Sequence, residues 1–112
     1  SSKTVLCHTE IMKEHLFVEK GRKGYEIKGI IDFEPSMAAI PEYDFCSVGL
    51  FVSGGGKNLF RHFLNSYGYT GDSSSVMRML LLHRYSNMKW FISTIPQSIT
   101  INSVEDLCKY WF

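Results

Sequence analysis

Two short polar segments, residues 8–15 and 31–34, enclose a stretch of sequence with the pattern of a β-hairpin. Residues 15–19 alternate between polar and apolar types, residues 20–24 hold the glycines and charged side chains of a turn, and residues 25–32 are rich in isoleucine. The two strands of a hairpin begin and end at the same edge. The sequence therefore predicts that the two polar segments, with their acidic and imidazole groups, lie side by side.

The composition is that of one small domain with an aromatic core. The chain has 112 residues, including eight Phe, six Tyr and two Trp, and a formal net charge of +1. A charge so close to zero gives no electrostatic basis for binding nucleic acid or an anionic membrane. No apolar run approaches the roughly 20 residues that a membrane span needs, and the first residues lack the organisation of a signal peptide. We therefore expect an intracellular protein, cytoplasmic or nuclear, with no nucleic-acid or membrane partner.

The cysteines give no sign of a disulfide framework or a zinc site. Cys7, Cys46 and Cys108 are odd in number, and none of them belongs to a Cys-x-x-Cys pair. We interpret them as reduced, buried thiols, which is the usual state of cysteine in cytosolic and nuclear proteins.

The remainder of the chain predicts one more short strand and then helices. Residues 4–7 form the strand, and Pro35 and Pro41 bracket a loop. The expected helices are residues 41–51 after Pro41, 57–67 before Gly68, 75–93 after the caps offered by Asp72 and the serines that follow it, and a last helix from Asn102 or Ser103 to Phe112. The predicted fold class is α+β, a small antiparallel hairpin or sheet followed by about four helices.

The longest predicted helix covers residues 75–93. Its apolar side chains recur at the spacing of a single helix face, and they are Met77, Leu81, Tyr85, Met88 and Ile92. His62 and His83 fall within predicted helices and have no evident ligand partner, so we assign them no function.

Three motifs follow one another in the first half of the chain. They are His8-Thr9-Glu10 with His15 after it, Ile31-Asp32-Phe33, and Pro41-Glu42-Tyr43-Asp44-Phe45. Their order and spacing resemble the aminoglycoside phosphotransferase and choline kinase family, which has a protein kinase-like fold. That family has a His-x-Asp catalytic loop with a following Asn, then an Ile-Asp-Phe or Ile-Asp-Trp metal loop, and then a helix that opens with Pro-x-Tyr-Asp. The specific part of the resemblance is residues 5–46.

The resemblance implies a role for each matching residue. Glu10 stands at the position of the Asp that orients or deprotonates the acceptor hydroxyl, and His8 supports this catalytic loop. Asp32 matches the main magnesium carboxylate, and His15 stands where an Asn helps to hold the metal. Asp44 matches the Asp that braces the catalytic loop. The implied cofactors are Mg²⁺ and ATP, bound by the intact protein.

Two of these positions are substituted, and this leaves alternatives open. Glu10 suits a general base or a loop-stabilising, solvated carboxylate equally well. Neutral imidazole is a poor magnesium ligand, so His15 fits a polar residue that opens a strand better than it fits a ligand. Asp32 is the hard oxygen ligand that magnesium requires, although an Asp in a turn is common too. A zinc trio of His8, Glu10 and His15 is disfavoured.

The resemblance extends only to the C-terminal lobe portion of such an enzyme. Residues 1–34 correspond to the catalytic and metal-loop hairpin and residues 41–112 to the helical part, within one domain that we expect to be a fragment of a larger phosphotransferase-like domain. The lobe that holds the nucleotide has no counterpart, so the isolated chain is expected to be inactive and to bind neither cofactor tightly.

The expected partners are the missing N-terminal lobe or other parts of the parent protein, or a second copy of the chain. Helices that have lost their neighbours expose apolar side chains, and such patches mark interfaces. The apolar side chains expected there are Trp90, Phe91, Trp111 and Phe112.

The predicted function is a partial or degenerate small-molecule phosphotransferase module. In the intact protein it takes part in the ATP- and magnesium-dependent phosphorylation of a hydroxyl group, on an amino alcohol, a sugar or an aminoglycoside-like amine. The alternative is a non-catalytic protein-interaction module derived from the same fold, which the substitutions at Glu10 and His15 favour. A third hypothesis is an unrelated small α+β domain.

Overall fold

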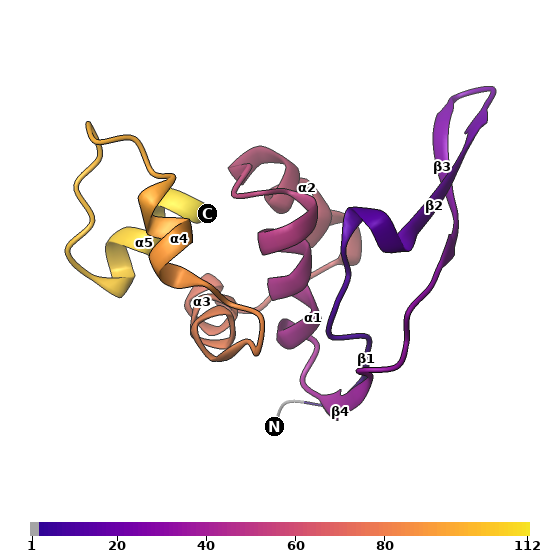
Figure 1. Ribbon diagram of the computed structural model, residues 1–112, viewed down its shortest axis with the longest axis horizontal. Coiled ribbons are helices and arrows are strands. Elements are labelled where there is room, and N and C mark those ends of the chain that lie inside the picture. Colours follow the sequence, from indigo (N-terminus) through magenta and orange to yellow (C-terminus); the bar gives the residue numbers. More distant parts are fainter. Residues whose placement is uncertain (1–2) are drawn as a thin grey trace.

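A computed structural model describes residues 3–112 and shows two small antiparallel sheets and a group of short helices (Figure 1). The strands are β1 Val5–Cys7, β2 Leu16–Gly21, β3 Gly24–Ile30 and β4 Met37–Ala39. The helices are α1 Glu42–Ser47, α2 Lys57–Tyr67, α3 Ser73–Leu82, α4 Met88–Ser93 and α5 Val104–Trp111, with a 3-10 turn at Lys13–His15 and a π-helical turn at Val48–Val52. The predicted α+β class is confirmed.

The predicted hairpin is the β2–β3 pair. Leu16 pairs with Ile30 and Gly21 with Gly24, which leaves a two-residue connection at the tip. Gly24 has a φ of +121°, a conformation that side chains rarely adopt, so the turn requires glycine at this position. The hairpin projects away from the helices (Figure 1). Its base therefore marks where the two polar segments meet the rest of the protein.

The loop predicted between Pro35 and Pro41 contains a strand instead. Residues 37–39 form β4, which pairs antiparallel with β1, Cys7 facing Met37 and Val5 facing Ala39. A three-residue strand between two prolines carries almost no local signal, because its stability comes from backbone pairing with a segment far away in the sequence. This second sheet fixes the chain on both sides of the two polar segments.

The helix predicted over residues 75–93 is wrong as a single element. It divides into α3 and α4, with a break at residues 83–87. His83 turns to an extended backbone conformation with ψ of 132°, and its side chain enters the core rather than continuing the helix face. Asn87 then begins α4, since its side chain accepts a hydrogen bond from the backbone N–H of Trp90.

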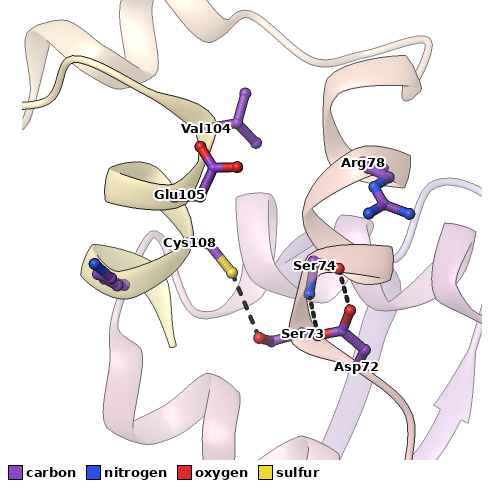
Figure 2. Close-up of a pocket in the computed structure, with 8 residues that line it drawn as sticks. Asp72, Ser73, Ser74, Arg78, Val104, Glu105 and Cys108 are labelled. Atoms are coloured by element: carbon purple, nitrogen blue, oxygen red, sulfur yellow. Dashed lines mark hydrogen bonds between the residues drawn. The ribbon is translucent and has the colours of Figure 1, made fainter.

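The other predicted helix boundaries hold to within about two residues, although α3 begins at Ser73 and the helix predicted over residues 41–51 is α1 followed by the π-helical turn. α2 ends at Gly68 in the left-handed conformation, with φ of +80°. Asp72 caps α3 by accepting from the backbone N–H of Ser74, and Ser103 caps α5 by accepting from that of Asp106. Figure 2 shows the start of α3 beside α5, where the Ser73 hydroxyl and the Cys108 thiol lie 3.4 Å apart.

The core lies between the helices, and its largest fully buried side chains are those of Trp111, Phe60, Met77 and Leu80. Phe91 stacks on Trp111 with ring centroids 3.9 Å apart. The expectation that Phe91 and Trp111 are exposed is therefore wrong, because α4 and α5 pack these rings against each other. Trp90 is exposed and Phe112 is half-buried.

The cysteines are free thiols. Cys7 and Cys46 are buried, and Cys108 is half-buried. Burial raises the pKa of Cys7 to about 11, which keeps this thiol protonated and unreactive at neutral pH. Within residues 3–112, every helix is too short or too polar to cross a bilayer.

Candidate functional site

The two polar segments form two loops at the base of the hairpin, which we call the first site loop (residues 8–10) and the second site loop (residues 31–35). Asp44, in the first turn of α1, fixes the first site loop. Its carboxylate accepts the backbone N–H of His8 at 2.8 Å and that of Thr9 at 2.7 Å. Hydrogen bonds to an ionised acceptor are about twice as strong as neutral ones. One carboxylate thus determines the path of two consecutive peptide groups.

Thr9 occupies a backbone conformation that is unfavourable for a β-branched residue, with φ of +71°. The residue is fully buried, and its hydroxyl donates to the carbonyl of Pro35 at 3.1 Å. Its own carbonyl accepts from Ser47 Oγ at 2.9 Å and from His83 Nε2 at 3.0 Å. These contacts hold Thr9 in its strained conformation, and the turn it makes directs the following Glu10 away from the core.

His8 joins the two site loops. Its Nε2 donates to the carbonyl of Ile31 at 2.8 Å, and its Nδ1 accepts the backbone N–H of Glu10 at 3.2 Å. The ring is buried and meets Phe33 edge-on, with centroids 4.6 Å apart. Because both ring nitrogens are already engaged within the protein, His8 positions the loops and is not available to a metal ion or a substrate.

Glu10, His15 and Asp32 converge. Their potential ligand atoms all lie within 4.8 Å of one another. His15 Nε2 is 3.3 Å from Asp32 Oδ2, and the two residues stand on adjacent chain segments because Ile31 donates its N–H to the His15 carbonyl at 3.0 Å. Asp32 has a left-handed φ of +67°, so each site loop contains one strained residue that is not glycine.

An open hollow of about 330 Å³ gives access to these carboxylates. It is lined by Glu10, Asp32, Glu34, Pro35 and Tyr85. Three of the five lining residues are acidic, so the hollow attracts a cation or a cationic ligand. Glu34 belongs to the second polar segment predicted at this place, although the sequence analysis gave it no role of its own, and Tyr85 is a lining residue that the sequence analysis missed. Tyr85 lines the hollow because helix α3 ends before it. The sequence analysis predicted one continuous helix across this position and therefore did not indicate that Tyr85 lies at the site.

A family model described as the phosphotransferase enzyme family matches residues 1–80, which include both site loops, α1, α2 and most of α3. The chain belongs to the phosphotransferase enzyme family. Searches of the curated proteins and of the solved structures found no match. The resemblance to aminoglycoside phosphotransferases is thereby confirmed, whereas the assignment to one lobe stays a prediction.

This phosphotransferase family member also has a buried serine–histidine pair that the sequence analysis missed. Ser47 Oγ lies 3.0 Å from His83 Nε2, and both groups donate to the Thr9 carbonyl. His83 Nδ1 accepts the backbone N–H of Tyr85 at 3.2 Å, so the imidazole is held neutral, and burial lowers its pKa below the ordinary value. The pair therefore positions the first site loop and does not form a nucleophile with its base.

A second hollow lies between α3 and α5 (Figure 2). Its polar lining mixes both signs of charge, with Asp72 and Glu105 against Arg78 and Lys109. None of the residues that match the family motifs lines it. Of the residues that match those motifs, Glu10 and Asp32 line the first hollow instead.

Proposed function

We propose that the chain carries the acceptor-side loop and the metal loop of a small-molecule phosphotransferase. The observation that supports this best is the convergence of Glu10 and Asp32 from two separate loops on one open hollow, with ligand atoms within 4.8 Å. In a family that transfers phosphoryl groups, one carboxylate at the acceptor and a second at the metal are the groups that the chemistry requires.

The two carboxylates suit magnesium, which takes oxygen ligands. Asp32 is the residue that would hold the ion, and the magnesium–ATP complex, when bound, supplies the phosphoryl group and offsets its negative charge. The imidazole of His15 does not suit magnesium. The donor set therefore fits magnesium through its carboxylates and departs from it at one position.

The geometry of Glu10 supports a role in proton transfer with an acceptor hydroxyl. Its backbone is fixed on both sides, because its N–H donates to His8 and its carbonyl accepts from His15. Its side chain lines the hollow. A glutamate reaches about one bond further than the aspartate of the family, and a misplacement of about 1 Å can lower the rate about a hundredfold.

The test measures phosphoryl transfer from ATP by the full-length protein to a panel of an amino alcohol, a sugar and an aminoglycoside. Glu10→Gln and Asp32→Asn are each expected to lower kcat/KM by about a hundredfold or more, since each removes a charge that acts at the reacting groups. Glu19→Gln, an exposed change in β2, serves as the matched control and keeps full activity. Wild-type activity in Glu10→Gln overturns the proposed role of Glu10, and the absence of transfer to every acceptor favours the second candidate.

The second candidate is a non-catalytic interaction module, and the surface of the hairpin favours it. Val18 in β2 pairs directly with Ile27 in β3. Tyr25, two positions before Ile27 in β3, lies on the same face of the hairpin. These three side chains are 56%, 67% and 74% exposed. Apolar groups clustered on a projecting hairpin suit contact with another protein surface or a second copy of the chain. Sedimentation analysis of the wild type and of Ile27→Lys tests this, because the lysine is expected to abolish association.

A further inference from the structure

We infer that Glu10, His15 and Asp32 form a site that binds a first-row transition-metal ion in preference to magnesium. The inference rests on the same two loops as the proposed phosphotransferase function and specifies which metal they select. It follows from the orientation of His15, which stands where the family has an asparagine.

His15 presents one definite ring nitrogen to the site. Its Nδ1 lies 2.7 Å from the carbonyl oxygen of Glu10, and because a carbonyl only accepts, Nδ1 carries the hydrogen. Nε2 therefore directs its lone pair or a second proton toward Asp32 Oδ2. Metal-binding histidines almost always donate their other ring N–H to a carbonyl or carboxylate in this way, which fixes the tautomer and the ring orientation.

The distances suit a shared cation. Ligand atoms bonded at about 2.1 Å to one tetrahedral ion stand about 3.4 Å apart, close to the 3.3 Å between His15 Nε2 and Asp32 Oδ2. The three ligand atoms lie within 4.8 Å of one another, so small side-chain rotations bring all three to one ion. His15 is the fixed member, with a side chain only 14% exposed, whereas the Asp32 side chain is 42% exposed and free to adjust.

A plain ion pair between protonated His15 and Asp32 explains the 3.3 Å contact but not the third group. Glu10 brings a further acceptor to the same point, where it would only add negative charge without a cation to share. One ion bound by a nitrogen and two carboxylate oxygens satisfies all three groups. Imidazole together with carboxylates is a donor set typical of zinc and other late first-row metals.

The preference has a consequence for the proposed chemistry. Affinity for a nitrogen-containing site rises from Mn²⁺ through Co²⁺ to Cu²⁺ and is lower again for Zn²⁺, whereas magnesium binds imidazole poorly. A zinc ion that engages Glu10 also removes this carboxylate from proton transfer. Zinc is therefore expected to occupy the site more tightly than magnesium and to oppose phosphoryl transfer.

The test is a calorimetric titration of the full-length protein with ZnCl₂ and with MgCl₂, in the absence of nucleotide. Zn²⁺ is expected to bind at least about 100-fold more tightly than Mg²⁺. His15→Asn, which restores the family's residue, is expected to weaken Zn²⁺ binding at least about tenfold without weakening Mg²⁺ binding. His62→Asn, on the exposed surface of α2, is the matched control and leaves both affinities unchanged.

Equal affinity for the two ions overturns the inference, and so does an unchanged zinc affinity in His15→Asn, which would point to the cysteines or other histidines. A second measurement on the wild type avoids any dependence on the folding of a variant. In ¹⁵N-labelled protein, zinc is expected to shift the Nε2 resonance of His15 and to leave Nδ1 protonated. Neither measurement involves phosphoryl transfer, so failure of the proposed activity and failure of the metal preference are observed separately.

Discussion

The first site loop and the β2–β3 hairpin are close in the sequence, yet they are stabilised in opposite ways. Thr9 is completely buried and its backbone is bound by side chains from α1 and from the end of α3. The hairpin depends on pairing between neighbouring strands, and its apolar side chains Val18 and Ile27 face solvent. The conformation of the first site loop therefore depends on tertiary contacts, whereas that of the hairpin depends on the local sequence.

This difference predicts where substitutions matter. A change that removes a distant support of the first site loop should lower stability and disturb Glu10 together. A change on the hairpin face should alter association with other molecules and leave the fold intact.

Asp44→Ala is expected to cost the most. The change leaves the backbone N–H groups of His8 and Thr9 without their acceptor and releases the strained turn at Thr9. Hydrogen bonds to a charged group contribute about 1.5–3 kcal/mol each, so the free energy of unfolding should fall by about 3 kcal/mol. Urea denaturation measures this loss. Glu14→Ala, an exposed carboxylate in the 3-10 turn, is the control and should change stability by less than about 0.5 kcal/mol. A loss that small in Asp44→Ala as well would show that the loop does not depend on α1.

Acidification tests the second support of the loop, His83. Burial lowers the pKa of His83 below its ordinary value of about 6.5, so below that pH the unfolded chain binds a proton that the folded chain does not. The free energy of unfolding should therefore fall as the pH drops below about 6.5, with a slope approaching about 1.4 kcal/mol per pH unit, until the folded pKa is passed.

The matched variants for this experiment are His83→Gln and His62→Gln. His83→Gln removes the titrating group and should flatten the pH dependence. His62→Gln replaces an exposed histidine and should keep the slope of the wild type. An identical slope in wild type and His83→Gln would mean that other groups cause the acid sensitivity.

The difference between local and tertiary contacts also explains which features could be predicted from the sequence. The hairpin was predictable because its alternation, its glycine turn and its charged tip all lie within residues 15–32. The positions of Glu10, Asp32 and Asp44 followed from the order of the motifs. Ser47 and His83 could not be found, since the partner they share, Thr9, is distant in the sequence and a histidine at the end of an apolar helix face gives no signal of burial.

The break after α3 had a similar cause. The apolar spacing of Met77, Tyr85 and Met88 fits one helix, and no proline or glycine interrupts it. The competing interaction is tertiary: the side chain of His83 forms its hydrogen bonds in the core, and Tyr43 stacks on its ring at 4.6 Å. Local propensity is weak enough for such a contact to override it.

A smaller effect on stability is expected at Asp32, where two substitutions separate the cost of the left-handed backbone from the loss of the carboxylate charge. Asp32→Gly and Asp32→Ala both remove the carboxylate, but only glycine adopts a φ of +67° without cost. The glycine variant should be more stable than the alanine variant by about 1 kcal/mol, and both should lose metal affinity. Thermal unfolding compares the two directly. Equal stability would show that the second site loop relaxes when the side chain is removed, and that its strain is not imposed by the fold.

The smallest effect on stability is expected on the hairpin. It is measured by making the same Val→Thr change at an exposed position of the hairpin and at a buried position of the core. Val18 is 56% exposed and Val76 is completely buried. Val18→Thr should change the free energy of unfolding by less than about 0.5 kcal/mol, whereas Val76→Thr places a hydroxyl in the core and should cost about 1–2 kcal/mol. Both variants are compared by urea denaturation at low and high protein concentration. If Val18→Thr becomes costly only at high concentration, the hairpin face is covered by a second copy of the chain, because association adds to stability in proportion to the logarithm of concentration. If Val18→Thr lowers the free energy of unfolding at every protein concentration, the hairpin packs against another part of the protein. The hairpin would then depend on tertiary contacts, as the first site loop does.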